Sequence, residues 1–95
     1  MRAIAYHFWS PTCPPCKAIK PALDDLKEEF SQVTWVSVNI QEDPQNLALK
    51  YDVKVVPTIV TLKINEFGNP VNVDNHTGTN MMGYYRLFRN AIQQE

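Results

Sequence analysis

Residues 8–17 read Phe8-Trp9-Ser10-Pro11-Thr12-Cys13-Pro14-Pro15-Cys16-Lys17, and this stretch joins a strand-like segment to a helix-like one. The preceding residues, from Ala3 to Trp9, are apolar and aromatic, which is typical of a strand buried on both faces. After Cys13, apolar residues recur at helical spacing: Ile19, Leu23, Leu26 and Phe30. Prolines suit the first helical turn, whose amides lack partners, whereas Pro21 is expected to bend the helix. The stretch therefore predicts a strand, a turn with both cysteines, and an amphipathic helix.

The two cysteines are separated by two residues at the expected helix start. On a first turn, such a pair falls within the Cα separation of about 4.4 to 6.8 Å that a disulfide requires. The helix dipole and the free amides favour a thiolate at Cys13, which makes Cys13 the expected nucleophile and Cys16 the resolving thiol. A structural disulfide and half of a zinc site are the alternatives. Zinc would need two more ligands, and His7 and His76 lack finger-like spacing.

Two further strands are expected in the middle of the chain. β-branched and aromatic residues indicate strands over residues 33–40 and 54–64. The second strand is nearly continuous in apolar residues, which predicts a central position in a sheet. Between them, the pair Asp43-Pro44 is expected to cap a short helix over residues 47–51 and to fill its first turn.

The end of the chain predicts a hairpin and a last helix. Turn formers at residues 65–70 lead into residues 71–74, where valines alternate with polar residues as in a half-exposed strand. A helix follows Gly78, with Thr79 or Asn80 as its cap. Its buried stripe is expected to comprise Met81, Tyr84, Tyr85, Phe88 and Ile92. The right-handed crossover rule makes the first two strands parallel, and the hairpin makes the last two antiparallel.

Composition limits the class of protein. Ninety-five residues with 44% hydrophobic content predict a single domain over residues 1–95. A net charge of −1 gives no basic footprint for nucleic acid, and the apolar runs are too short for a membrane span. Two cysteines do not resemble a secreted disulfide framework, and the start of the chain has no export signal. We therefore expect a cytoplasmic protein that binds neither nucleic acid nor membrane.

The stretch 8–17 closely resembles the active-site segment of the thioredoxin family. Further matches follow in order along the chain: Pro21, Asn39-Ile40, Pro44, Tyr51-Asp52-Val53, Val56-Pro57-Thr58, Gly68 and Gly78. The resemblance implies an α/β thioredoxin fold in its minimal form, βαβαββα, with a four-stranded mixed sheet flanked by helices. The family's usual opening strand and helix have no counterpart here. The implied activity is the reduction of protein disulfides through Cys13 and Cys16.

The resemblance also assigns a binding surface and partners. Pro57 is expected to follow a cis peptide bond and to face the cysteines, with the backbone of Val56 free to pair with a client strand. The expected docking surface comprises Trp9, Pro14, Ile40, Val56, Pro57, Thr77 and Gly78. No cofactor or metal is implied beyond the Cys13–Cys16 disulfide itself. Expected partners are disulfide-bearing clients such as ribonucleotide reductase, with a thioredoxin reductase or glutathione as the electron source.

Three departures from the family pattern carry hypotheses of their own. His7 stands where the family has a buried acid, and Ser37 replaces a nearby lysine; we hypothesise that His7 accepts the proton of Cys16. A histidine that is simply packed in the core is the alternative. Pro14 removes an amide from the first turn, so that the amides of Cys16 and Lys17 are the first that can solvate the thiolate. Without a further strand, residues 33–40 form a sheet edge, which predicts a monomer or weak dimer.

Other readings remain open at this stage. A glutaredoxin-like reductase that uses glutathione is one, although Thr77-Gly78-Thr79 replaces that family's Gly-Gly-Asp type of segment. A non-catalytic binding module that holds a partner near Pro57 is another. Trp9 suits either a core or a docking position. Trp35 is expected in the core, and His76 in a solvated loop.

Overall fold

The structure is a computed structural model that describes residues 2–93. Four strands form one sheet in the order β2-β1-β3-β4. β1 pairs in parallel with β2 and antiparallel with β3, and β3 pairs antiparallel with β4. The elements are β1 (Arg2–Trp9), α1 (Pro14–Glu29), β2 (Thr34–Asn39), α2 (Leu47–Lys50), β3 (Thr58–Ile64), β4 (Pro70–Thr77) and α3 (Met81–Ile92). This order confirms the predicted mixed four-stranded α/β fold.

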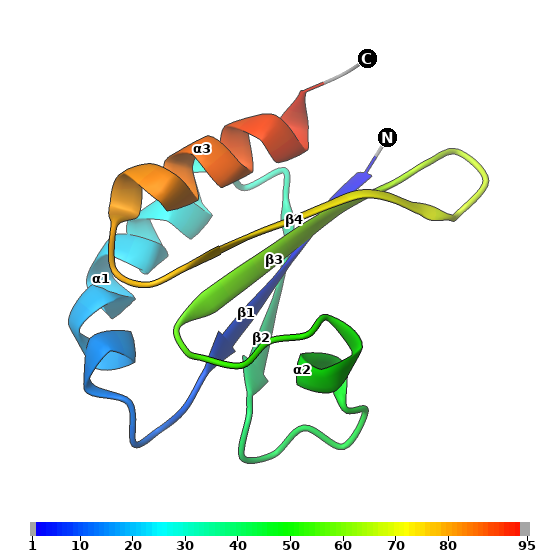
Figure 1. Ribbon diagram of the computed structural model, residues 1–95. Helices are drawn as coiled ribbons and strands as arrows, with labels where there is room; N and C mark the ends of the chain where they lie inside the picture. Colours follow the sequence, from blue (N-terminus) through cyan, green and yellow to red (C-terminus); the bar gives the residue numbers. More distant parts are fainter. Residues whose placement is uncertain (1, 94–95) are drawn as a thin grey trace.

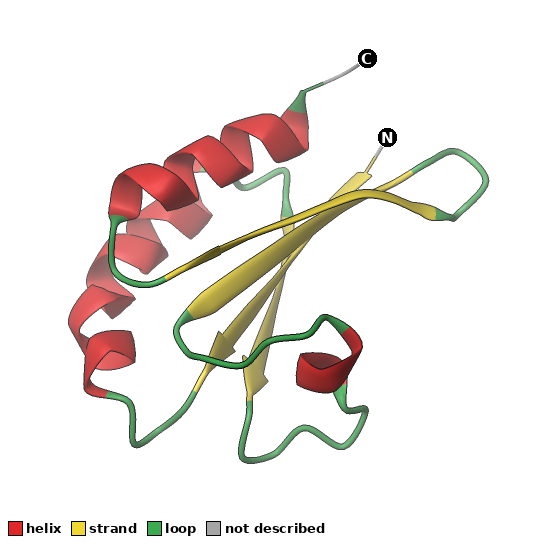
Figure 2. Ribbon diagram, viewed as in Figure 1, coloured by secondary structure: helices red, strands yellow, loops and turns green. Residues whose placement is uncertain are grey.

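The sheet is covered by helices on both faces (Figures 1 and 2). On one face, α1 and α3 pack over Ala3 and Ala5 of β1, whose small side chains let the helices approach the sheet. On the other face, Phe8 and Val38 pack with residues of α2 and of the segment that follows it. Because side chains alternate along β1, this strand contributes to both layers, and it ends directly before the turn that carries the cysteines.

Two predicted boundaries were wrong. The strand expected over residues 54–64 begins only at Thr58. Pro57 precedes it, and a proline has no amide with which to extend the ladder. The short helix begins at Leu47 after Asn46, which leaves Pro44 in the preceding turn instead of the first helical turn. Asp43 still acts as expected of a cap, because its carboxylate accepts hydrogen bonds from the amides of Leu47 and Ala48 at 3.0 and 2.9 Å.

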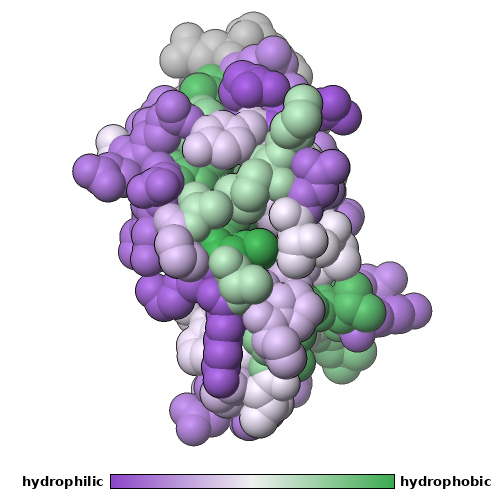
Figure 3. Space-filling model, turned by 90° about the vertical axis from the view of Figure 1, so that its left-hand side faces the viewer, coloured by the Kyte–Doolittle hydropathy of each residue, from purple (hydrophilic) through white to green (hydrophobic). Residues whose placement is uncertain are grey.

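The buried stripe of α3 is rotated from the predicted one. Its buried residues are Tyr84, Leu87, Phe88 and Ala91, whereas Met81, Tyr85 and Ile92 are only partly buried. The expected cap is confirmed at Asn80, whose side-chain oxygen accepts a hydrogen bond from the amide of Met82 at 3.0 Å. Figure 3 views the molecule from the side on which α1 and the start of α3 lie, and it shows apolar atoms bordered by hydrophilic side chains. No helix among residues 2–93 is long and apolar enough to cross a membrane.

Candidate active site

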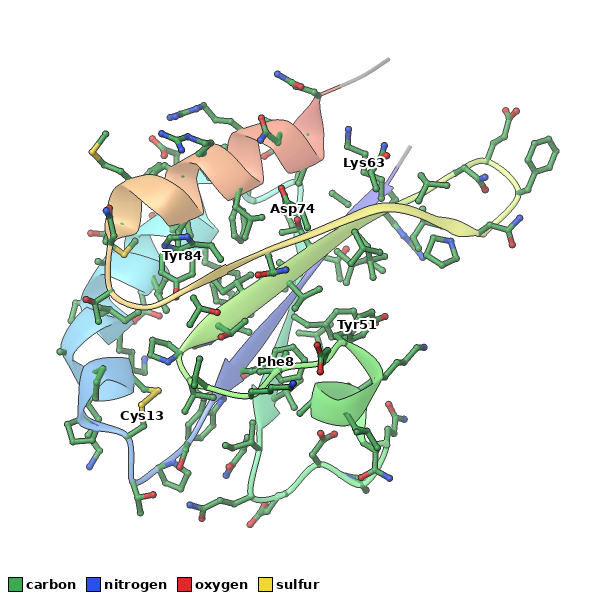
Figure 4. All side chains as sticks on the ribbon, in the orientation of Figure 1. Phe8, Cys13, Tyr51, Lys63, Asp74 and Tyr84 are labelled. Carbon is green, nitrogen blue, oxygen red and sulfur yellow. A yellow bond between two sulfur atoms is a disulfide. The ribbon has the colours of Figure 1, made fainter. Side chains whose placement is uncertain are left out.

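Cys13 and Cys16 form a disulfide at the amino end of α1 (Figure 4). Cys13 is the N-cap residue and Cys16 lies in the first turn, with their Cα atoms 5.2 Å apart. Both residues are buried, with 8% and 7% of their surface exposed. The expected spacing for a disulfide is therefore present without any rearrangement of the helix start.

The first turn of α1 offers its amide to the outer sulfur. Pro14 and Pro15 occupy the first two helical positions and have no N–H. The amide of Cys16 donates to Cys13 Sγ at 3.1 Å. Because this donor also lies at the positive end of the helix dipole, the same geometry stabilises a negative charge on Cys13 when the disulfide is open. The order of events expected from the sequence, with Cys13 ionised first, has a structural basis here.

The segment around Pro57 lies against the disulfide. The peptide bond between Val56 and Pro57 is cis, and the carbonyl oxygen of Val56 lies 3.7 Å from Cys13 Sγ. The amide of Gly78 donates to the carbonyl oxygen of Pro57 at 3.0 Å. The structure thus brings together Cys13, Val56, Pro57 and Gly78, four of the residues singled out from the sequence.

Tyr84 holds the segments of Pro57 and Gly78 together, a role beyond the core position that helical spacing predicted for it. Its side chain is fully buried, and its hydroxyl lies 2.7 Å from the carbonyl oxygen of Gly78 and 3.3 Å from that of Pro57. Burial raises the pKa of Tyr84 to about 12, so the hydroxyl keeps its proton and remains a donor at neutral pH. Helical spacing indicated that this residue points inward but could not indicate what its hydroxyl meets.

The remaining docking candidates lie near the surface. Thr77 is exposed, and its hydroxyl lies 2.7 Å from that of Thr58. Ile40 is 39% exposed and donates its amide to the carbonyl oxygen of Trp9 at 2.9 Å. Trp9 is half-buried, and its indole N–H donates to Ser37 Oγ at 2.7 Å. Pro14 is exposed in the first turn of α1.

Two exposed apolar side chains near these residues were not anticipated. Val55 is 57% exposed and directly precedes Val56, and Met82 is 73% exposed in the first turn of α3. Val55 adjoins the segment that lies against Cys13, and an exposed apolar side chain in such a position is of the kind that a protein partner covers. A signal for Val55 was present in the sequence, because it adjoins the segment already assigned to client binding.

His7 lies on the face of β1 toward α1, in the same groove as Cys16. Its Nε2 atom is buried and has no hydrogen-bond partner within residues 2–93, and its ring centroid is 5.4 Å from that of Trp35. Burial lowers the pKa of His7 to about 4, while nearby Asp24 acts to raise it and Lys20 to lower it further. The imidazole is therefore neutral at pH 7. Its role in proton transfer stays a prediction.

His76 lies in β4, which corrects the expectation of a solvated loop residue. Its ring meets Tyr84 edge-on at 4.5 Å between centroids, and its Nε2 lies 3.0 Å from the carbonyl oxygen of Asn80. Gly83 leaves the room for this ring, because a Cβ atom at residue 83 would collide with it. Within the described chain, no three histidine, cysteine or acidic side chains gather as a metal-binding group.

These observations define a small α/β protein with a redox-capable pair of cysteines at a helix start. The sequence model of the family described as Thioredoxin matches residues 2–83. The chain belongs to the thioredoxin family.

The relatives differ from this chain in length. Over 60 residues, the chain is 33% identical to a thioredoxin of Pyropia yezoensis, an alignment that covers 62% of this chain and 55% of that one. Over 57 residues, it is 37% identical to thioredoxin 1 of Synechococcus elongatus, covering 59% and 52% respectively. The chain thus spans about half the length of the curated relatives it matches. The crystal structure of Fasciola hepatica thioredoxin superimposes with a TM-score of 0.79 at 28% identity, over 95% of this chain and 81% of that chain.

Proposed function

We propose that this chain is a protein disulfide oxidoreductase that reduces disulfides in client proteins. The observation that carries the proposal is the Cys13–Cys16 disulfide at the start of α1, with the Cys16 amide directed at Cys13 Sγ. Membership of the thioredoxin family supports the same activity. The Cys13–Cys16 pair is the redox couple, because it alternates between the dithiol and the disulfide form during the exchange.

The reaction proceeds by two successive thiol–disulfide exchanges. In the reduced protein, the Cys13 thiolate attacks one sulfur of the client disulfide, which forms a mixed disulfide and releases the first client thiolate. The Cys16 thiolate then attacks Cys13 Sγ, which closes the Cys13–Cys16 bond and releases the second client thiolate. Two electrons pass to the client, and the two thiol protons leave with them through solvent or a nearby base. A thiol-based reductant returns the protein to its dithiol form.

The base that accepts the Cys16 proton is proposed to be His7. The support is positional: His7 and Cys16 line one groove, and His7 Nε2 is buried with no hydrogen-bond partner among residues 2–93. Burial lowers the pKa of His7 to about 4, so its ring is neutral at pH 7 and a weaker base than a free imidazole, and it would pass the Cys16 proton on to solvent without holding it. A pH–rate profile of resolution that is unchanged in His7→Ala would contradict this role.

The client is proposed to dock on the surface around Pro57. The backbone of Val56 is close to Cys13, and we propose that Thr77, Gly78, Ile40 and Pro14 form the surrounding surface, with Trp9 on the side of the groove that Cys16 lines. An extended client segment that paired with Val56 would present its sulfur to Cys13. The exposed apolar side chain of Val55, which directly precedes Val56, extends this surface.

The proposed activity is tested by the reduction of insulin with a catalytic amount of the protein and dithiothreitol as the reductant. We expect turnover with the wild-type chain and none with Cys13→Ser, because the nucleophile is lost. A thioredoxin reductase assay and a glutathione-coupled assay, run side by side, distinguish a thioredoxin-like from a glutaredoxin-like electron source. If the double variant Cys13→Ser, Cys16→Ser replaces the wild-type protein in cells without harm, the chain is a binding module and the proposal is wrong.

Location and partners are proposals of the same kind. We infer a cytoplasmic protein, because a dithiol that must be kept reducible suits a reducing compartment. A thioredoxin reductase or glutathione is the proposed reductant, and ribonucleotide reductase is a proposed client. β2 is the edge strand on one side of the described sheet, which supports a monomer or weak dimer. Sedimentation across a range of protein concentrations tests the dimer, and cell fractionation tests the location.

A further inference from the structure

A groove of about 280 Å³ is lined by Cys16 but not by Cys13, Val56 or Pro57. It lies between α1 and the uncovered parts of β1 and β2, and Cys16 is among its lining residues. Cys13 Sγ faces the carbonyl oxygen of Val56, whereas Cys16 faces the groove. A client segment that passes over the disulfide from Val56 would therefore reach this groove.

Three lysines of one helix face line the groove. Lys17, Lys20 and Lys27 are exposed, and Asp24 is the single carboxylate among the lining residues of the described chain. Lys20 Nζ is 3.2 Å from an oxygen of Asp24, so that one of the three positive charges is neutralised. The groove keeps a local excess of positive charge, although the whole chain has a net charge of −1.

The floor of the groove is aromatic and ordered. Trp9 is fixed by the hydrogen bond from its indole N–H to Ser37 Oγ at 2.7 Å. At the far end, Lys27 Nζ lies 5.8 Å from the ring centroid of Trp35. The neutral ring of His7 adds no charge at pH 7. An occupant is thus offered apolar surface below and positive charge along one wall.

We propose that this groove binds an acidic segment of the client protein whose disulfide is attacked by Cys13. The inference rests on the proposed function and adds a preference among clients. Charge complementarity decides the occupant, because positively charged side chains at the rim attract carboxylates and speed encounter with the correct partner.

The dimensions set where the acidic residues should lie. Lys17 and Lys27 are ten residues apart on α1, which corresponds to about 15 Å along the helix axis. An extended segment of about four or five residues covers that length. Acidic side chains within about five residues of the reactive client cysteine should therefore raise the rate of reaction. Only those on one flank of the cysteine should do so, because the groove lies on one side of the disulfide.

The test uses three disulfide-linked peptides as oxidants of the reduced protein. One has neutral flanks, one has four acidic residues before the cysteine, and one has four after it. The measurement is the second-order rate constant for oxidation by each peptide at low ionic strength. We expect one acidic peptide to react about threefold to tenfold faster than the neutral one, since each exposed ion pair contributes modestly. The preference should vanish in high salt, where the Debye length falls to about 3 Å.

The groove variant combines Lys17→Gln, Lys20→Gln and Lys27→Gln. Its matched control combines Lys50→Gln, Arg86→Gln and Arg89→Gln, which removes the same charge from exposed positions outside the groove. The preference for the acidic peptide should disappear in the groove variant and persist in the control. Equal rates for all peptides with the wild-type chain, or a preference that survives in the groove variant, would overturn the proposal. If no peptide oxidises the reduced protein, the proposed function fails instead.

Discussion

The two sides of the disulfide differ in how their polar groups are paired. On the side of Pro57, the carbonyl oxygens of Pro57 and Gly78 accept hydrogen bonds from the hydroxyl of buried Tyr84. The amide of Gly78 also donates to the carbonyl oxygen of Pro57. On the groove side, the buried Nε2 of His7 has no partner in the described chain. One side therefore holds a fixed backbone geometry, while the other has an imidazole nitrogen that is unpaired among residues 2–93, in the groove that Cys16 also lines.

The largest expected effect is the loss of folding stability at acidic pH, which arises on the groove side from His7. The pKa of His7 is lowered from 6.5 to about 4 in the folded protein, chiefly by burial. Between these values the unfolded chain binds more protons than the folded one, so stability falls as pH drops from about 6.5 to about 4. The expected loss from this residue is about 2–3 kcal/mol. Denaturant unfolding across this pH range should show a shallower slope in His7→Phe than in the wild type.

A parallel slope in the two proteins would contradict the burial assigned to His7. The difference between the proteins is the informative quantity, because carboxylates titrate over part of the same range and contribute equally to both. Above pH 7 the wild type and the variant should both show a flat profile from this group, since the imidazole is neutral in either state.

A smaller effect concerns the packing that supports Tyr84. Gly83→Ala should place a methyl group where the imidazole of His76 lies, and so displace His76 from its edge-on contact with Tyr84. In a His76→Ala background the same change should stabilise the protein by about 0.5–1 kcal/mol, because alanine favours a helix over glycine. In the wild-type background that gain should be absent. A double-mutant cycle measured by denaturant unfolding should give a coupling of about 1 kcal/mol, and additive changes would show that the ring is free to move away.

An effect of similar size is expected from Tyr84→Phe. Removing the hydroxyl leaves the buried carbonyl oxygens of Pro57 and Gly78 without this donor, which should cost about 1 kcal/mol of stability. Because Tyr84 acts on clients only through the segments it holds, we expect a higher KM for a protein disulfide with little change in kcat. Tyr85→Phe, on the same helix and packed against Phe30, is the control and should leave KM unchanged. An unchanged KM in Tyr84→Phe would remove its role in positioning the client surface.

The local part of this site could be predicted from the sequence, because it depends on neighbouring residues. Periodicity after Cys13 indicated α1, and the two-residue spacing placed both sulfurs on its first turn. The fold followed from the order of strands and helices, together with the resemblance of the motif to its family. These features rest on interactions within a few residues or on alternation along one element.

The rest depends on contacts between distant segments. The Tyr84 hydroxyl meets the carbonyl oxygen of Pro57, which lies 27 residues earlier in the chain. Helical spacing shows only that such a side chain is directed inward. The position of His76 over Gly83 likewise depends on how β4 and α3 pack together. The cationic groove is formed by α1 together with β1 and β2, so its lysines form one surface only once these elements are packed together.

The central claim is that Cys13 attacks a client and Cys16 resolves the product. Its most direct test is to mix reduced Cys16→Ser with a disulfide-containing protein, quench with acid, and identify the products by mass spectrometry. The mechanism predicts a stable mixed disulfide through Cys13. Cys13→Ser should accumulate little adduct, because the amide donor at the start of α1 is directed at residue 13 and stabilises a thiolate there. An adduct that forms preferentially through Cys16, or none with either variant, would contradict the assignment.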